Sequence, residues 1–211
     1  MAYDVVIFDL DGTLLDTLDD LMDSCNYALS TIGAPPRTRA EIRRFVGNGI
    51  RNLMLQAVPD GADNPKFEQA YETMQTWYKA HNQIKTAPYP GVQRLIRTLK
   101  QQGVPMAVVS NKPDASVQML VEQWFPEITF GLGEREGLRR KPERDMVDYA
   151  IAQLGQTGKK TVYVGDSEVD LTTAANAGLD CISVTWGFRD RALGAKQFAD
   201  TAEELLRLIQ G

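Results

Sequence analysis

Cysteine and histidine are scarce in this chain of 211 residues, and its 23 basic residues are outnumbered by 28 acidic ones. Its two cysteines, Cys25 and Cys181, lie far apart and each inside an apolar stretch, so we expect buried thiols and no disulfide. The formal net charge is -5, which argues against general binding of nucleic acid through a basic field. The single histidine, His81, is expected at the surface, and its isolation argues against chemistry built on a catalytic histidine.

Long hydrophobic runs are absent as well. The first apolar run is too short to cross a membrane, and the residues before it lack the basic segment of a signal peptide. We therefore expect a cytoplasmic protein with no membrane partner. The chain is long enough for one sizeable core, or for one domain that carries an insertion. Nothing in the sequence indicates the oligomeric state.

The most informative segment follows at once. The apolar residues Val5, Val6 and Ile7 lead through Phe8 into two acids and a glycine, Asp9, Asp11 and Gly12. Such a run is typical of a buried parallel strand that delivers carboxylates to the crevice at the carboxyl edge of the sheet. Two acids so close together repel each other unless a cation lies between them. The segment therefore predicts a metal site and a nucleophile.

Helical spacing dominates from about residue 16 to about residue 86, and no strand signal appears there. Thr38 and Glu41 resemble a capping box that opens a short helix through Val46. We interpret the aromatic residues Trp77 and Tyr78 as core between helices. The apolar stripes comprise Leu18, Leu21, Met22, Cys25 and Leu29, then Ile50, Leu53, Met54, Ala57 and Val58, and then Phe67, Ala70, Tyr71, Met74, Trp77 and Tyr78.

Helices and strands alternate from Pro90 onward, which predicts an α/β fold with a doubly wound parallel sheet. The all-helical stretch is then an insertion after the first strand, a cap of residues 16–87 on a core formed by residues 1–15 and 88–211. The predicted strands of this second part cover 104–110, 128–130, 161–165 and 181–185, and the helices cover 91–102, 114–124, 143–154, 168–177 and 201–210.

Polar clusters gather at one edge of the predicted sheet, because the carboxyl ends of parallel strands meet there. Each cluster alone has an ordinary explanation as a turn, a helix cap or a solvated basic run. Their charges complement one another, however, which favours a functional site. Besides the first acids, the clusters are Ser110, Asn111 and Lys112 after the second strand, Lys141 and Pro142 before a helix, and Gly165, Asp166, Ser167 and Asp170 after the fourth strand.

With these motifs the chain resembles the haloacid dehalogenase superfamily, and within it the phosphatases that carry a helical cap after the first motif. The Asp-x-Asp-Gly-Thr, Ser-Asn, Lys-Pro and Gly-Asp-Ser-x-x-x-Asp motifs stand in the family's order. The resemblance implies that Asp9 is a nucleophile that forms an aspartyl-phosphate. It implies that Asp11 protonates the leaving oxygen and then activates water. It also implies Mg²⁺ held by Asp9, the carbonyl group of Asp11, and Asp166.

The resemblance assigns further roles around this centre. Lys141 neutralises the phosphoryl oxygens, and Ser110 with the backbone amide of Asn111 holds another oxygen. Asp170 orients Lys141 or metal-bound water, with Ser167 in support. Thr13 is an additional candidate near the substrate. Lys112 either reaches the substrate as well or is an exposed charge near the next helix. The segment Trp186 to Arg189 follows the last strand, where it either lines the mouth of the site or packs against the core.

The substrate is less determined than the chemistry. Asp11 argues against a dehalogenase, which lacks an acid at this position, and Leu21 stands where the β-phosphoglucomutase branch carries a histidine. The cap segment Val46-Gly47-Asn48-Gly49 resembles a turn of phosphoglycolate phosphatases, although it is equally typical of a glycine that ends a helix.

A small anionic phosphate, 2-phosphoglycolate first, is therefore expected, with Arg51 as a candidate for its carboxylate. Pyrophosphate, a sugar phosphate, a nucleotide and a non-catalytic phosphate-binding role remain alternatives.

Overall fold

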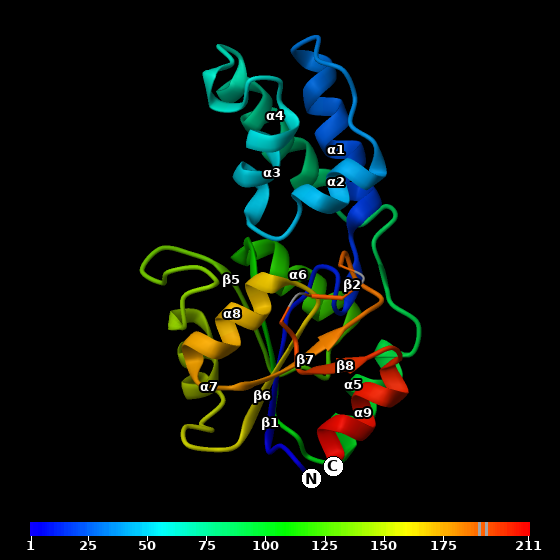
Figure 1. Ribbon diagram of the computed structural model, residues 1–211, viewed down its shortest axis with the longest axis vertical. Helices are drawn as coiled ribbons and strands as arrows, with labels where there is room; N and C mark the ends of the chain where they lie inside the picture. Colours follow the sequence, from blue (N-terminus) through cyan, green and yellow to red (C-terminus); the bar gives the residue numbers. More distant parts are fainter. Residues whose placement is uncertain (190, 193) are drawn as a thin grey trace. The chain divides into compact units, whose positions relative to one another are not determined.

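The structure is a computed structural model that describes residues 1–189, 191–192 and 194–211 (Figure 1). These residues form two compact units, one made of Met1–Leu15 and Pro88–Gly211 and the other of Asp16–Ala87. Two short strands, β2 (Leu15–Asp16) and β3 (Ala87–Pro88), lie where the chain passes from one unit to the other. None of the described helices is long and apolar enough to cross a membrane.

The first unit is built on a six-stranded sheet in the order β5-β4-β1-β6-β7-β8, in which every adjacent pair is parallel. Strand β1 is central because all four of its side chains are apolar and fully buried, which requires cover on both faces. The α/β prediction is therefore confirmed. The strands are β1 (Val5–Phe8), β4 (Met106–Pro113), β5 (Phe130–Glu134), β6 (Thr161–Gly165), β7 (Asp180–Val184) and β8 (Gln197–Ala199).

Within the described part of the chain, five helices cover the two faces of this sheet. The alternate residues of β1 point to opposite sides, so Val6 and Phe8 belong to one apolar cluster and Val5 and Ile7 to another. Helices α5 (Val92–Gln101), α6 (Asp114–Trp124) and α9 (Ala202–Gln210) contribute to the first cluster, and α7 (Asp145–Gln153) and α8 (Glu168–Ala177) contribute to the second.

Three strands of the six-stranded sheet depart by more than one residue from the sequence prediction. Strand β4 begins two residues later than predicted and continues to Pro113, so that Asn111 and Lys112 lie inside it instead of after it. Strand β5 lies at Phe130–Glu134 and not at 128–130, because Gly133 permits a close approach to β4. A Cβ atom on Gly133 would lie 2.5 Å from the carbonyl oxygen of Lys112. The short edge strand β8 was not predicted at all.

The second unit is helical. The capping box of Thr38 and Glu41 is confirmed at the start of its second helix.

Both cysteines are free, with Cys25 buried in the helical unit and Cys181 partly buried in the other. The helices of the unit are α1 (Leu18–Thr31), α2 (Arg39–Phe45), α3 (Gly49–Ala57), the 3₁₀ helix η1 (Gly61–Asp63) and α4 (Phe67–His81).

One prediction for the helical unit is half wrong. Tyr78 is buried, but Trp77 is not in the core. Its ring is stacked between Tyr27, at a centroid distance of 3.7 Å, and His81, at 3.9 Å. Apolar residues at helical spacing lie on one side of the helix, but those at the margin of that side, such as Trp77, are still partly exposed.

Candidate active site

Asp9 lies immediately after β1, where the central strand of the sheet ends. It is 8% exposed, and its Oδ1 atom accepts a hydrogen bond from the backbone N–H of Leu10 at 2.7 Å. The same oxygen lies 2.9 Å from Nζ of Lys141. Burial, opposed by the charge of Lys141, raises the pKa of Asp9 well above its usual range. The end of β1 therefore presents a desolvated carboxyl group that depends on a cation nearby.

Lys141 supplies that cation from the segment before α7. Its side chain is only 2% exposed, and Nζ also contacts Oδ1 of Asp170 at 2.8 Å and the hydroxyl of Tyr163 at 3.0 Å. Burial opposes the charge, but attraction by Asp170 and Asp9 outweighs it and holds the pKa of Lys141 well above its usual range. Lys141 therefore stays protonated.

Asn111 fixes the backbone of Lys141. Its side-chain amide donates to the carbonyl oxygen of Lys141 at 3.0 Å, and its side-chain oxygen accepts from the N–H of Lys141 at 2.9 Å. Both backbone polar groups of Lys141, its N–H and its C=O, are thus satisfied by one buried side chain from β4. These two hydrogen bonds join the segment of Asn111 to the segment of Lys141. The sequence predicted both segments at the site but not this contact between them.

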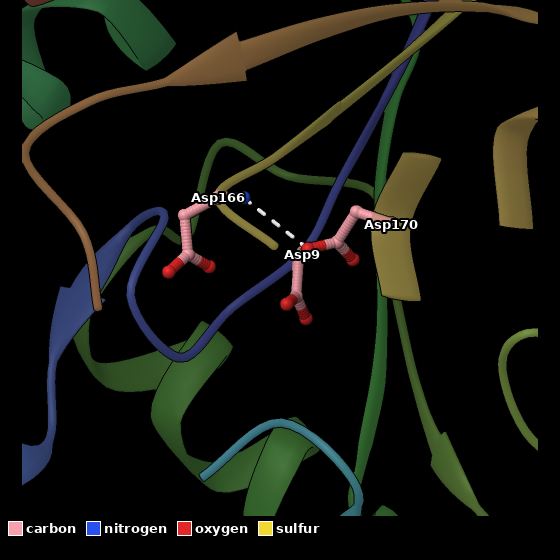
Figure 2. A group of neighbouring side chains, drawn as sticks. All are labelled: Asp9, Asp166 and Asp170. Atoms are coloured by element: carbon pink, nitrogen blue, oxygen red, sulfur yellow. Dashed lines mark hydrogen bonds between the residues drawn. The ribbon is translucent and has the colours of Figure 1, made fainter. Parts of the chain in front are cut away.

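Asp166 follows β6 and Asp170 lies in the first turn of α8 (Figure 2). Oδ2 of Asp170 accepts from the N–H of Asp166 at 3.2 Å, and from the N–H and hydroxyl of Ser167 at 3.0 and 2.7 Å. Since its Oδ1 contacts Lys141, both oxygens of Asp170 are engaged. Asp170 therefore positions Lys141 and caps α8.

The carboxylates at this edge of the sheet could hold a divalent cation. Oxygens of Asp9, Asp166 and Asp170 lie within 4.8 Å of one another (Figure 2). Burial, reinforced by the charge of Asp170, raises the pKa of Asp166 to about 7. Two desolvated acids so close together are the oxygen donors that a hard cation prefers. Because Oδ1 of Asp170 already binds the ammonium of Lys141 and its Oδ2 already accepts three hydrogen bonds, Asp9 and Asp166 are the better ligands.

Two glycines make room for Asp166. A Cβ atom on Gly12 or on Gly187 would come within 2.6 Å of its Oδ2 atom, and Gly12 also has a φ of +83°. The N–H of Phe188 donates to the same oxygen at 2.7 Å, and the hydroxyl of Thr13 lies 3.4 Å from Oδ1. The backbone thus closes on Asp166 from two loops, which only glycine permits. Thr13 contacts this carboxylate.

Asp11 is paired with Lys112. Nζ of Lys112 lies 3.0 Å from Oδ1 and 3.3 Å from Oδ2 of Asp11. The lysine side chain is 3% exposed and that of Asp11 is 17% exposed. Ser110 is buried beside them, and its hydroxyl accepts from the N–H of Lys112 at 3.3 Å. Lys112 therefore contacts the proposed acid–base residue directly.

The other candidate residues, Gly47, Asn48 and Arg51, belong to the helical unit. Gly47 has a φ of +127°, and Asn48 immediately precedes α3. Both terminal nitrogens of Arg51 bind Glu68, at 3.0 and 2.5 Å, and the guanidinium lies 4.9 Å from the ring centroid of Tyr71. Arg51 thus has a protein partner already, and its role toward a substrate stays a prediction.

Tyr163 is a site residue that sequence reasoning missed. It lies in the buried strand β6, where an aromatic residue is typical of the core, and no local signal shows that its hydroxyl reaches Lys141. The sequence placed Phe188 in a segment that either lines the mouth of the site or packs against the core. The structure shows a different contact, in which the backbone N–H of Phe188 binds the carboxylate of Asp166.

Comparisons with known proteins place the chain in one family of hydrolases. The profile of the haloacid dehalogenase-like hydrolase family matches residues 6–184. A phosphoglycolate phosphatase of Pseudomonas putida is 32% identical, over 98% of this chain and 79% of its own length. One from Agrobacterium fabrum is also 32% identical, over 88% of this chain and 82% of its own.

Solved structures with a similar fold include relatives of the same kind. A candidate phosphoglycolate phosphatase from Lactobacillus delbrueckii superposes with a TM-score of 0.92 at 39% identity, covering 99% of both chains. A protein tyrosine kinase A of Mycobacterium tuberculosis, at 25% identity and a TM-score of 0.82, shows that the fold alone does not define the reaction. Together, the acidic strand ends, the buried lysine and these relatives show that the chain belongs to the haloacid dehalogenase-like hydrolases and is a phosphoric monoester hydrolase.

Proposed function

We propose that this protein is a Mg²⁺-dependent phosphomonoesterase that works through an aspartyl-phosphate on Asp9. The contact of 2.9 Å between Lys141 and Asp9 carries the proposal, because it combines a buried carboxylate with a fixed positive charge. A phosphate dianion that approaches two or more carboxylates meets repulsion of roughly 4 kcal/mol for each close pair of unit charges. A site with this composition therefore favours anionic substrates only if cations accompany them.

The reaction divides into two steps. Oδ1 of Asp9 is held by Leu10 and Lys141, so Oδ2 is the oxygen that attacks phosphorus. The bond from phosphorus to the leaving oxygen breaks as Asp11 donates a proton to that oxygen. In the second step Asp11 takes a proton from water, which attacks the phosphorus and releases inorganic phosphate and Asp9.

Mg²⁺ would be held by the carboxylates of Asp9 and Asp166 and by the carbonyl group of Asp11. When bound, it supplies positive charge that offsets the repulsion between the substrate and these acids. Lys141 contributes the second charge. Ser110 and the backbone amide of Asn111 hold a further phosphoryl oxygen.

We propose 2-phosphoglycolate as the substrate and residues 16–87 as a cap domain, with residues 1–15 and 88–211 as the core. The relatives named phosphoglycolate phosphatase support this choice. The turn Val46-Gly47-Asn48-Gly49 and the carboxylate-matching fork of Arg51 support a substrate that carries a carboxylate. The cap would admit the substrate and then exclude water, with hinges at the chain crossings near residues 15–18 and 85–90.

The first test measures phosphate release from an aryl phosphate with Mg²⁺ and with a chelator. We expect turnover only with Mg²⁺, and none from Asp9→Asn, whose amide is a poor nucleophile. Asp4→Asn, an exposed acid before the same strand, is the matched control and should behave like wild type. Metal-independent turnover, or full activity of Asp9→Asn, would overturn the mechanism.

The second test compares kcat/KM for 2-phosphoglycolate, pyrophosphate, sugar phosphates and nucleotides. We expect 2-phosphoglycolate to rank first. If it ranks no higher than the sugar phosphates, the substrate proposal is wrong while the phosphatase chemistry stands.

A further inference from the structure

The ammonium group of Lys141 has three N–H bonds, and the protein supplies an acceptor for each. Two are the carboxylates of Asp9 and Asp170, and the third is the neutral hydroxyl of Tyr163 at 3.0 Å. All four side chains are buried. The third acceptor differs from the others because it directs the ammonium without adding charge.

The proton of Tyr163 is directed away from Lys141. Burial raises the pKa of Tyr163 well above its usual range, so the phenol keeps its proton. The hydroxyl donates that proton to the carbonyl oxygen of Val109 at 3.1 Å. An oxygen whose proton is committed in this way presents its lone pairs to the ammonium. Tyr163 therefore acts toward Lys141 as an acceptor of fixed direction.

The sheet places Tyr163 where it joins two parts of the site. Tyr163 in β6 lies opposite Ile7 in β1, and β4 pairs with the other edge of β1. Val109 in β4 immediately precedes Ser110. The phenol thus bridges β6 to β4 over β1 and connects Lys141 to the strand that carries a predicted phosphate ligand.

We propose that Tyr163 is a positioning residue that holds Lys141 in place while Asp9 is being phosphorylated. This inference rests on the proposed function. As Asp9 bonds to phosphorus, its negative charge passes to the phosphoryl oxygens, and the ammonium must exchange one acceptor for another. Asp170 and Tyr163 are the two acceptors that do not change. With both in place, Lys141 meets the new charge without moving.

Tyr163→Phe tests this role, since it removes one oxygen and keeps the ring. We expect kcat to fall about tenfold or more, because hydrogen bonds to charged groups are among the strong ones, with KM changed less than about twofold. Tyr3→Phe is the matched control. Tyr3 is a buried tyrosine of the same unit whose hydroxyl donates to Asp180, and its loss should leave kcat unchanged.

Two inhibitors separate positioning from a purely structural role. Orthovanadate adopts the five-coordinate geometry of the transition state, whereas inorganic phosphate resembles the product. Tyr163→Phe should weaken vanadate inhibition by about the same factor as kcat and phosphate inhibition by less than about twofold. Equal weakening of both inhibitors, or a kcat within about twofold of wild type, would overturn the proposal.

Incorporation of 3-fluorotyrosine at position 163 gives a second variant that keeps the fold and weakens the acceptor. A smaller loss of kcat in the same direction is expected, and no loss would contradict the proposal. Wild-type turnover and Asp9→Asn are measured in the same assay. If the wild type does not turn over with Mg²⁺, the proposed function fails. If it does and Tyr163→Phe matches it, only the role of Tyr163 fails.

Discussion

Lys112 forms an ion pair with Asp11, and its ammonium lies 3.0 Å from Oδ1 and 3.3 Å from Oδ2 of that residue. The two residues are 101 positions apart in the sequence. The sequence predicted that each lies at the site, but not that the lysine contacts the proposed acid–base group. The pair restricts the orientation of the carboxylate that must face first the leaving oxygen and then water.

Lys112→Met should reduce kcat/KM about tenfold. The variant keeps the length and packing of the side chain but releases Asp11, and it also removes positive charge from the site. Steady-state kinetics with an aryl phosphate measure the effect. Lys100→Met, an exposed lysine on α5, is the control and should leave kcat/KM unchanged. An unchanged rate for Lys112→Met would show that Asp11 does not need this partner.

Stability in the absence of metal should fall as the pH rises from about 4 to about 7. The pKa of Asp166 is about 7 in the folded chain and near 3.8 in the unfolded one, so the folded chain binds the extra proton between these values. The contribution of Asp166 to the unfolding free energy is then fully present below the lower value and is lost as the pH passes the higher one. Thermal melts in the presence of a chelator measure this dependence.

Mg²⁺ should reverse that loss, because it binds the deprotonated carboxylates and competes with the proton. We expect saturating Mg²⁺ to raise Tm more at about pH 8 than at about pH 5, because these two values lie on either side of the pKa of Asp166. Asp166→Asn should abolish the Mg²⁺ effect and weaken the pH dependence of stability that is measured with a chelator, while Asp9, whose pKa is also raised, keeps part of that dependence. An equal rise in Tm at both pH values would contradict the assignment of Asp166 as a ligand.

Gly12→Ala should weaken the metal site. The added Cβ would lie 2.6 Å from Oδ2 of Asp166 in a backbone conformation with a φ of +83°. Displacement of that carboxylate should raise the Mg²⁺ concentration for half-maximal activity by about tenfold, equivalent to roughly 1.4 kcal/mol.

Gly178→Ala is the matched control for this change. Gly178 has a φ of +72°, with no atom within 4 Å of an added Cβ. It should cost about 1 kcal/mol of stability without changing the Mg²⁺ requirement. If both variants show the same Mg²⁺ requirement, crowding of Asp166 does not limit metal binding.

Arg51 must exchange Glu68 for a substrate carboxylate if it binds one. Glu68→Gln weakens the competing partner, so it should lower KM for 2-phosphoglycolate by about twofold to fivefold, as befits an exposed pair. Arg51→Ala should raise that KM and leave KM for an aryl phosphate unchanged. Lys79→Ala, an exposed cation on α4, is the control. Equal losses on both substrates would remove Arg51 from substrate recognition.

Several elements were predictable because local patterns encode them. Strand β6 and helix α8 have the predicted bounds, since an apolar run ends at Gly165 and a capping box of Ser167 and Asp170 starts the helix. Strand β4 was predicted to end too early, because Asn111 and Lys112 are polar residues that nevertheless belong to the sheet. These polar side chains contact other residues of the site, so their presence in a strand reflects function and not the apolar composition that is typical of strands.

The sequence by itself determined the α/β fold, the helical insertion and the order of the acidic, serine and lysine motifs, because periodicity and turn residues act over short distances. Only the tertiary structure decided which partner each charged group has. Lys141 meets Asp9, Asp170 and Tyr163, Lys112 meets Asp11, and Arg51 meets Glu68. These pairs join residues between 17 and 132 positions apart, and packing sets their distances, which no local pattern encodes.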